Sequence, residues 1–152
     1  MMRAIPATIA SLLFCLLCAL PGAPALAEEG KAQPFIVESY YRIQWGHFDE
    51  FMELFKRNHY PILARLKELG QIQSMNAAFP VHHAGEDSRW DWRMTIVIPD
   101  RRKLDAFEKA FAEVTAELYP DAAKLKQEEQ RRFSLLLEHT DVPITLDDLS
   151  GW

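Results

Sequence analysis

Cysteine is nearly absent from this sequence: there are two, Cys15 and Cys18, and both lie in an apolar N-terminal stretch. A single positive charge, Arg3, precedes this stretch, and the small-residue site Ala25–Ala27 follows it. A charged start, a short apolar core and an A-x-A site form the pattern of a cleavable secretory signal. We therefore predict a signal peptide over residues 1–27 and a periplasmic or secreted protein. The mature chain would have no thiol, which excludes disulfides, cysteine-metal sites and thiol catalysis.

Long apolar runs and excess positive charge are also lacking. The run Ala4–Leu20 is shorter than the roughly 20 residues that span a bilayer, and no later run approaches that length, so we expect no stable membrane insertion after signal cleavage. The chain has 17 Lys and Arg against 22 Asp and Glu, a net charge of −5, and loss of Arg3 makes it more negative. Phosphate backbones repel such a surface, so nucleic acid is not an expected partner.

The rest of the chain contains no Gly/Ser/Pro linker and is long enough to bury one core, which favours a single domain. We place that domain at residues 35–140. A disordered N-terminus over 28–34 precedes it, and an extended tail over 141–152 follows it.

Alternation of apolar and polar residues predicts three extended segments. Period two over Phe35–Trp45 and over Trp90–Ile98, with aromatic and β-branched residues, is typical of strands. Gln71–Val81 is a further extended stretch, and the turn at residues 84–88 joins it to Trp90–Ile98. These two segments should form a β-hairpin.

Spacings of three and four predict the helices. One apolar stripe runs through Phe48–Leu69 and ends at Gly70. Because Pro61 lacks an N–H, this helix should kink or restart near Asn58–Pro61. Asp100 can cap a second helix that continues to Leu118.

The C-terminal part contains a third helix that Asp121 can cap, but its end is ambiguous. Phe133 and Leu136 continue the helical spacing, whereas Phe133, Leu135 and Leu137 alternate like a strand, so residues 133–139 fit either. The predicted order is β-α-β-β-α followed by this extra C-terminal helix with its ambiguous end. That is the split β-α-β, ferredoxin-like plan of the α+β class, an antiparallel sheet with helices on one face. The other face must then meet water or a partner.

Three segments together resemble the dimeric α+β barrel superfamily: Glu38–His47, Asn58–Pro61 and Trp90–Arg93. The resemblance covers roughly residues 35 to 118 and implies a homodimer in which two sheets pair face to face. The group includes small monooxygenases, haem-degrading enzymes, chlorite dismutase-like proteins and stress-response barrels. No catalytic motif of a named member is matched, so the resemblance implies fold and dimerisation, and no cofactor is identified.

A row of polar side chains alternates with the apolar residues of the predicted strands. Glu38, Tyr40 and Arg42 share one face of the first strand. If Trp90, Trp92, Val37 and Tyr41 turn toward the helices, this row and its counterpart on the hairpin strand line the opposite, barrel-facing side. Two interpretations stay open, a site that grips a polar ligand and a cross-strand ladder of charge pairs. The residues predicted to bind a ligand are Glu38, Asn76, Asp91 and Arg93.

His59 lies in a core-facing position of the first helix, beside a proline that frees a backbone carbonyl. A histidine held there can act as acid, base or ligand, and the prediction for catalytic residues is His59, Tyr40 and Arg42. The alternative is a buried imidazole that a neighbouring carbonyl or carboxylate satisfies.

The remaining histidines do not predict a metal site. His82 and His83 are adjacent in an extended segment and point to opposite faces, and His139 with Asp141 lies far along the chain. Arg101–Lys103 opens the second helix, where the dipole disfavours positive charge. An anion at this terminus and a solvated cluster are both open explanations.

These observations support three hypotheses of different classes. The first is an exported homodimeric barrel that binds a small organic ligand between sheet and helices, with monooxygenase-like or isomerase-like chemistry. The second is a non-enzymatic envelope stress or interaction protein whose polar sheet face is only a dimer interface. The third is haem or metal binding through His59.

Overall fold

The computed structural model describes residues 31–82 and 84–151, so the predicted signal peptide lies outside the described residues. Within the described part, no helix combines the length and the apolar character needed to cross a membrane. The regular elements are β1 (Phe35–Ile43), α1 (Phe48–Leu54), the π-helical turn η1 (Phe55–His59), α2 (Tyr60–Glu68), β2 (Ser74–Ala78), the 3-10 turn η2 (Glu86–Ser88), β3 (Trp92–Ile98), the 3-10 turn η3 (Arg101–Lys103), α3 (Leu104–Leu118), α4 (Ala122–Ser134), β4 (Leu136–Ile144) and the 3-10 turn η4 (Leu149–Gly151).

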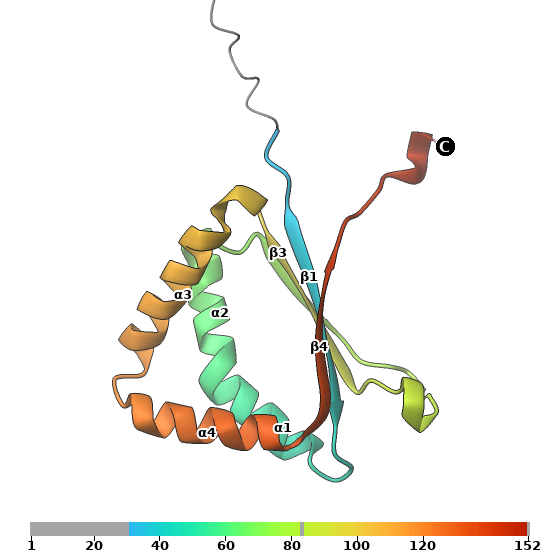
Figure 1. Ribbon diagram of the computed structural model, residues 1–152, viewed down its shortest axis with the longest axis vertical. Helices are drawn as coiled ribbons and strands as arrows, with labels where there is room; N and C mark the ends of the chain where they lie inside the picture. Colours follow the sequence, from blue (N-terminus) through green and yellow to red (C-terminus); the bar gives the residue numbers. More distant parts are fainter. Residues whose placement is uncertain (1–30, 83, 152) are drawn as a thin grey trace, which may run out of the picture. The chain divides into compact units, whose positions relative to one another are not determined.

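The four strands form one antiparallel sheet in the order β2-β3-β1-β4. All of the long helices lie on one side of this sheet (Figure 1). This is the ferredoxin-like arrangement, and α4 is the extra C-terminal helix, placed just before the last strand. The predicted α+β fold class, with helices on one face, is confirmed.

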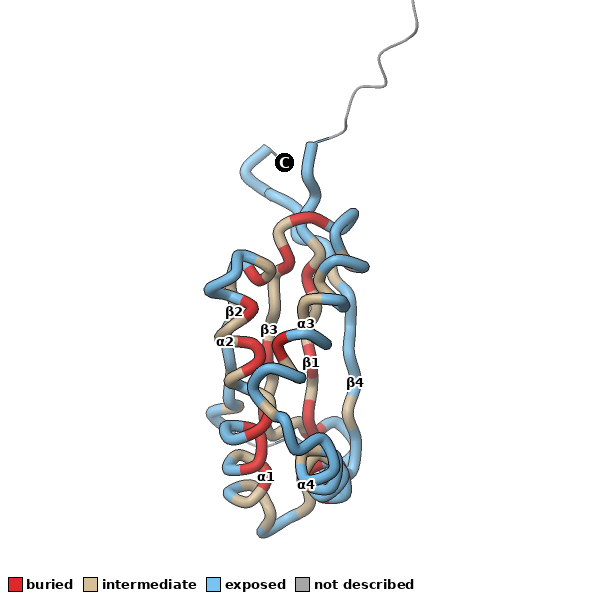
Figure 2. The backbone as a smooth tube through the Cα atoms, turned by 90° about the vertical axis from the view of Figure 1, so that its left-hand side faces the viewer, coloured by how far each residue is buried: buried red, intermediate tan, exposed pale blue. Residues whose placement is uncertain are grey.

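Alternation along β1 and β3 decides which side chains meet the helices. Tyr41 stands opposite Trp92, and both are buried in the core beneath the helices. The neighbouring pair, Tyr40 opposite Arg93, points to the other face, because successive strand residues alternate. Burial is concentrated in β1, β3, α1 and α2, whereas β4 is mostly exposed (Figure 2).

The long first helix is interrupted where the sequence predicted. The N–H of Tyr60 donates to the carbonyl of Phe55, five residues earlier, which makes the π-helical turn η1. Such turns are frequent at functional sites. Pro61 cannot donate to the carbonyl of Arg57, and the hydroxyl of Tyr119 donates to that carbonyl instead, at 2.6 Å. Pro61 thus leaves the Arg57 carbonyl available to Tyr119, which lies in the segment between α3 and α4.

The predicted helix ends are confirmed with one difference: Asp100 caps the 3-10 turn η3, which runs directly into α3. Asp100 Oδ1 accepts from the backbone N–H of Arg102 at 3.0 Å, and Asp121 Oδ1 accepts from the N–H of Lys124 at 3.0 Å. Gly70 follows α2 with φ +71°, a left-handed conformation that suits glycine.

The extended segments are shorter than their alternation predicted. β1 ends at Ile43 rather than Trp45, because the chain turns at Gly46, which has φ +82°. Trp45 is 67% exposed as a result. β2 covers only Ser74–Ala78 of the predicted 71–81 stretch, and β3 begins at Trp92 rather than Trp90.

Residues 133–139, which fitted either a helix or a strand, are divided between the two. The helix α4 continues to Ser134, and β4 begins at Leu136 and runs to Ile144, past the predicted domain boundary at residue 140. β4 pairs with β1 from Leu136 opposite Ile43 to Ile144 opposite Ile36. This tertiary pairing fixes the strand where local periodicity was ambiguous.

Candidate ligand-binding site

A cavity of about 420 Å³ lies between the sheet and the helices. Its size falls in the range of roughly 300–1,000 Å³ that small-molecule sites occupy. Most of its wall is apolar, and a few polar side chains contribute. The apolar lining is Phe35, Val37, Leu63, Met94, Ile96, Ile98, Leu104, Phe107, Phe111, Phe133 and Pro143, and the polar lining is Ser39, Tyr41, His59, Glu108, Arg132, His139 and Asp141.

Two strands supply polar groups in matching positions. Ser39 of β1 stands opposite Asp141 of β4, and Tyr41 stands opposite His139. The Ser39 hydroxyl donates to Asp141 Oδ1 at 2.5 Å, and the rings of Tyr41 and His139 lie 4.4 Å apart. Pairing of the edge strand β4 with β1 therefore assembles this polar cluster.

Arg132 of α4 lines one end of the cavity. Its side chain is 2% exposed and donates through Nε and Nη2 to the carboxylate of Glu129, at 3.2 and 2.5 Å. The guanidinium also lies 4.6 Å from the ring centroid of Phe133. A buried cation is tolerated only when it is paired and hydrogen-bonded, and Glu129 meets that requirement.

His59 ends the π-helical turn and reaches the cavity between two aromatic rings. Its ring centroid lies 5.2 Å from that of Phe55 and 6.0 Å from that of Phe111. Burial, followed by the nearby Arg132 charge, lowers the pKa of His59 to about 4. The imidazole is therefore neutral at pH 7.

Two other cavity groups also stay neutral. Burial raises the pKa of Tyr41 to about 12, which keeps the phenol protonated and able to donate. Burial also lowers the pKa of His139. Its Nε2 lies 3.5 Å from Asp141 Oδ1 without making a hydrogen bond. The polar end of the cavity thus offers neutral donors and acceptors.

The structure does not bring the three predicted catalytic residues together. His59 lines the cavity on the helix side, whereas Tyr40 and Arg42 lie on the opposite face of β1, because they alternate with Tyr41. The cavity holds Tyr41 in the position where the sequence suggested Tyr40.

Tyr40 and Arg42 belong instead to a ladder of charge pairs on the outer face. The Tyr40 hydroxyl donates to Glu38 Oε2 at 2.6 Å, and Glu38 Oε1 pairs with Arg93 at 3.2 Å. Arg42 pairs with Glu138 at 3.3 Å. The geometry on this face is that of the predicted cross-strand ladder.

Two predicted ligand-binding residues lie elsewhere. Asn76 is exposed on the short strand β2, opposite Thr95. Asp91 fixes the end of β1: its Oδ2 accepts from the N–H of Ile43 at 2.7 Å, and Arg89 donates to both of its oxygens.

The expectation that Trp90 faces the helices is wrong. Its ring lies edge-on to Tyr40, with centroids 6.1 Å apart, on the outer face. Alternation extends only from the first residue of β3, which is Trp92, so the irregular chain before it is free to turn Trp90 the other way.

Sequence reasoning did not place Ser39, Tyr41, Arg132, His139 and Asp141 in a site. His139 and Asp141 are two apart, as on one strand face, but that signal needs β4 to be known as a strand. Arg132 resembled an ordinary helix-surface charge.

Metal-ligating side chains are dispersed. Among the described residues, no group of three or more His, Cys, Asp or Glu side chains converges on one point. His82 is exposed, and His83 lies outside the described residues. The positive charges of Arg101–Lys103 at η3 are partly neutralised. Arg102 Nη2 donates to the carboxylate of Asp100 at 2.7 Å, which forms an ion pair.

Comparisons with known proteins identify the fold. No family model and no curated protein matches the sequence. A dimeric ferredoxin-like protein from an uncultured marine organism is 6% identical and has a TM-score of 0.53, covering 78% of this chain and 93% of its own.

Two further solved structures are similar at a TM-score of 0.47. A NIPSNAP family protein from Agrobacterium tumefaciens is 16% identical over 78% of this chain and 90% of its own. A mutant of SnoaB, a cofactor-independent oxygenase from Streptomyces nogalater, is 14% identical over 80% of this chain and 100% of its own. The chain has the ferredoxin-like fold, as its sequence predicted.

Proposed function

We propose that this protein binds a small, largely apolar organic molecule in the cavity between its sheet and its helices. The observation that carries the proposal is the cavity of about 420 Å³, apolar over most of its wall, with Tyr41, His59 and His139 among its few polar groups. Predominantly apolar pockets with few convergent polar groups are the usual form of small-molecule sites. The polar groups fix the orientation of the ligand.

The enzymatic form of this proposal is an isomerisation by proton transfer, and the groups present suffice for it. Tyr41, protonated up to a pKa of about 12, donates to a carbonyl oxygen of the ligand. Neutral His59 takes a proton from a carbon next to that carbonyl, the enol forms, and the proton returns at another carbon. Because the pKa of His59 is about 4, this base is weak and suits only strongly acidified C–H groups. A monooxygenase-like reaction would in addition need O₂.

Export and dimerisation form part of the proposal. The N-terminal signal pattern supports export. Dimerisation is supported by the dimeric state of the ferredoxin-like protein of the same fold. Light scattering on the purified mature chain tests the dimer, and a monomer at micromolar concentration would contradict it.

Binding is tested on protein purified after expression with its own signal, which also reports cleavage. Mass spectrometry of an organic extract detects a retained ligand, and an apolar fluorescent probe detects an empty cavity. Ile96→Trp fills the cavity and should abolish probe binding. Val97→Trp, one residue away on the outer face, should not. Equal probe binding by both variants and the wild type would overturn the proposal.

The interaction protein remains the second candidate, and the paired charges of Glu38 with Arg93 and of Arg42 with Glu138 favour it. A dimer without any probe binding would support this function. An absorption spectrum with a Soret band would support the third hypothesis, haem ligation through His59.

A further inference from the structure

The cavity changes character along its length. On β1 its lining runs from Phe35 and Val37 to Ser39 and Tyr41, and β4 repeats the order from Pro143 to Asp141. Because the strands are paired in register, with Val37 opposite both Pro143 and Ile96, the apolar lining residues of β1 and β4 lie toward one end and their polar lining residues toward the other.

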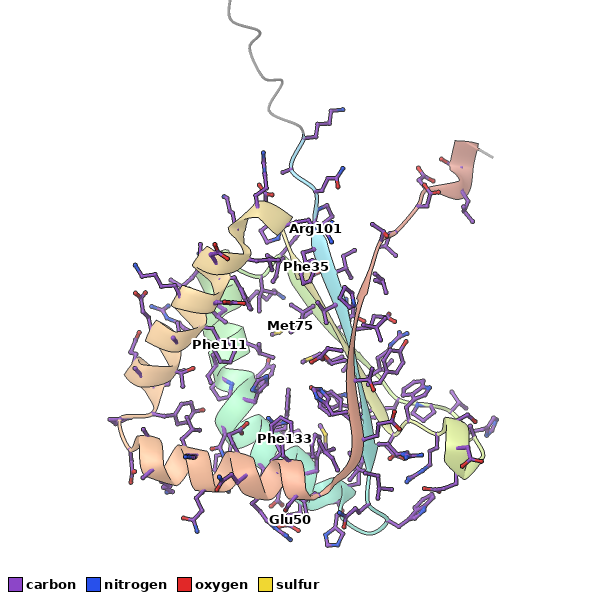
Figure 3. The ribbon with its side chains drawn as sticks, in the orientation of Figure 1. Phe35, Glu50, Met75, Arg101, Phe111 and Phe133 are labelled. Atoms are coloured by element: carbon purple, nitrogen blue, oxygen red, sulfur yellow. The ribbon has the colours of Figure 1, made fainter. Side chains whose placement is uncertain are left out.

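The helices border the same two ends. Phe35 lies at the end near the start of α3, Phe133 lies at the end near α4, and Phe111 faces the space from α3 (Figure 3). From Ser39 to Phe35 the chain advances four residues, about 13 Å at roughly 3.3 Å per residue. The apolar part of the cavity is therefore long enough for an extended hydrocarbon body.

The polar end disfavours charge of either sign. A cation is unfavourable at His59, whose pKa falls to about 4 through burial and the Arg132 charge. An anion is unfavourable at Tyr41, whose pKa rises to about 12 through burial. The charged side chains there are already engaged, since Arg132 pairs with Glu129 and Asp141 accepts from Ser39.

We infer that the cavity selects an uncharged amphiphile with a single polar head, such as a medium-chain alcohol or ketone, with its oxygen beside Tyr41 and its hydrocarbon end beside Phe35. This inference rests on the proposed function, because it names the class of ligand for the same cavity. At the polar end a carboxylate would meet the charge of Asp141, and an ammonium group would lose its hydration beside Arg132.

A series of probes with the same ten-carbon body tests the selection. We would measure displacement of the fluorescent apolar probe by 1-decanol, 2-decanone, decanoate and decylammonium, each below its critical micelle concentration, at pH 7.5. The alcohol and the ketone should bind about tenfold or more tightly than either ion. Binding of an ion as tight as that of decanol would overturn the inference and leave the proposed function standing. Failure of the fluorescent probe itself to bind would contradict the proposed function.

Two variants test the orientation. Tyr41→Phe removes the donor and should weaken 1-decanol and 1-hexanol equally, by about 3- to 10-fold. Val37→Trp fills the apolar end and should weaken decanol much more than hexanol. Tyr40→Phe, on the outer face, is the matched control and should change neither. The ratio of decanol to hexanol affinity compares ligands on the same protein, so it stays informative if a variant is partly destabilised. An unchanged ratio in Val37→Trp would overturn the orientation.

Discussion

The two faces of the sheet use the same strands for different purposes. On the helix side, Tyr41 lines the cavity and stacks on Trp92, with ring centroids 4.8 Å apart. On the outer side, one residue along each strand, Tyr40 and Arg93 belong to a ladder of charge pairs. A shift of one residue in register would exchange the two sets. The pairing of β1 with its neighbours thus decides where chemistry and where association can occur.

The largest effect should come from Trp92→Ala. Trp92 is 2% exposed and contacts Tyr41, Phe51 and Phe55. Loss of a buried Trp side chain should lower the free energy of unfolding by about 3–5 kcal/mol, measured by urea denaturation at fixed protein concentration.

Trp90→Ala is the control for this substitution, because Trp90 lies two residues away and on the outer face. It should cost less than about 2 kcal/mol. Equal losses for the two tryptophans would contradict the distinction between the faces.

The next effect is a pH dependence of stability that comes from a cavity residue, His59. The pKa of His59 is about 4 in the folded chain and near 6.5 unfolded. The unfolded chain therefore binds this proton first as the pH falls. The stability contributed by the neutral imidazole is complete above pH 6.5 and is lost as the pH falls toward 4, by about 3 kcal/mol.

His59→Leu should flatten the stability profile between pH 6.5 and 4, as followed by thermal unfolding. The lowered pKa of His139 acts in the same direction, so some slope remains in the variant. An unchanged slope would show that His59 is not held neutral by burial.

A smaller effect on stability is expected from the hydrogen bond between Ser39 and Asp141. Ser39→Ala removes the donor to Asp141 on the cavity side and should cost about 1–2 kcal/mol. Thr95→Ala, on the outer face of β3, should cost less in the same urea titration. A greater loss for Thr95→Ala would place the more important hydrogen bond on the outer face.

The smallest effect on stability should come from Arg93→Ala. Its pair with Glu38 is partly exposed, with 34% of the Arg93 side chain and 17% of the Glu38 side chain accessible. Such pairs contribute up to about 1 kcal/mol and weaken in salt. The substitution should change the dimer dissociation constant measurably and leave the thermal midpoint of the dissociated chain nearly unchanged. A changed midpoint with an unchanged dissociation constant would count against a dimer on this face.

Local patterns in the sequence were enough to predict the helices and the strands β1, β2 and β3, but not β4. Aromatic and β-branched alternation identified β1 and β3, and Asp100, Asp121 and Gly70 marked helix ends at the residues where the structure has them. These signals are local, so they can be seen without knowing which segments meet.

The site was less predictable because it depends on segments that meet only in the folded chain. His59 was singled out from its place beside Pro61. Its cavity neighbours His139 and Asp141 lie on β4, whose strand character comes from pairing with β1. The predicted partners Tyr40 and Arg42 had the right chemistry, but alternation puts them on the other face.

Pro143, which lines the cavity, also affects the exposed edge of the sheet. β4 is an edge strand, and such a strand presents backbone groups to which another chain can add. A proline contributes no N–H to this row, and the carboxylates of Glu138 and Asp141 place like charges along it. Pro143 therefore disfavours aggregation of the chain through pairing at this edge.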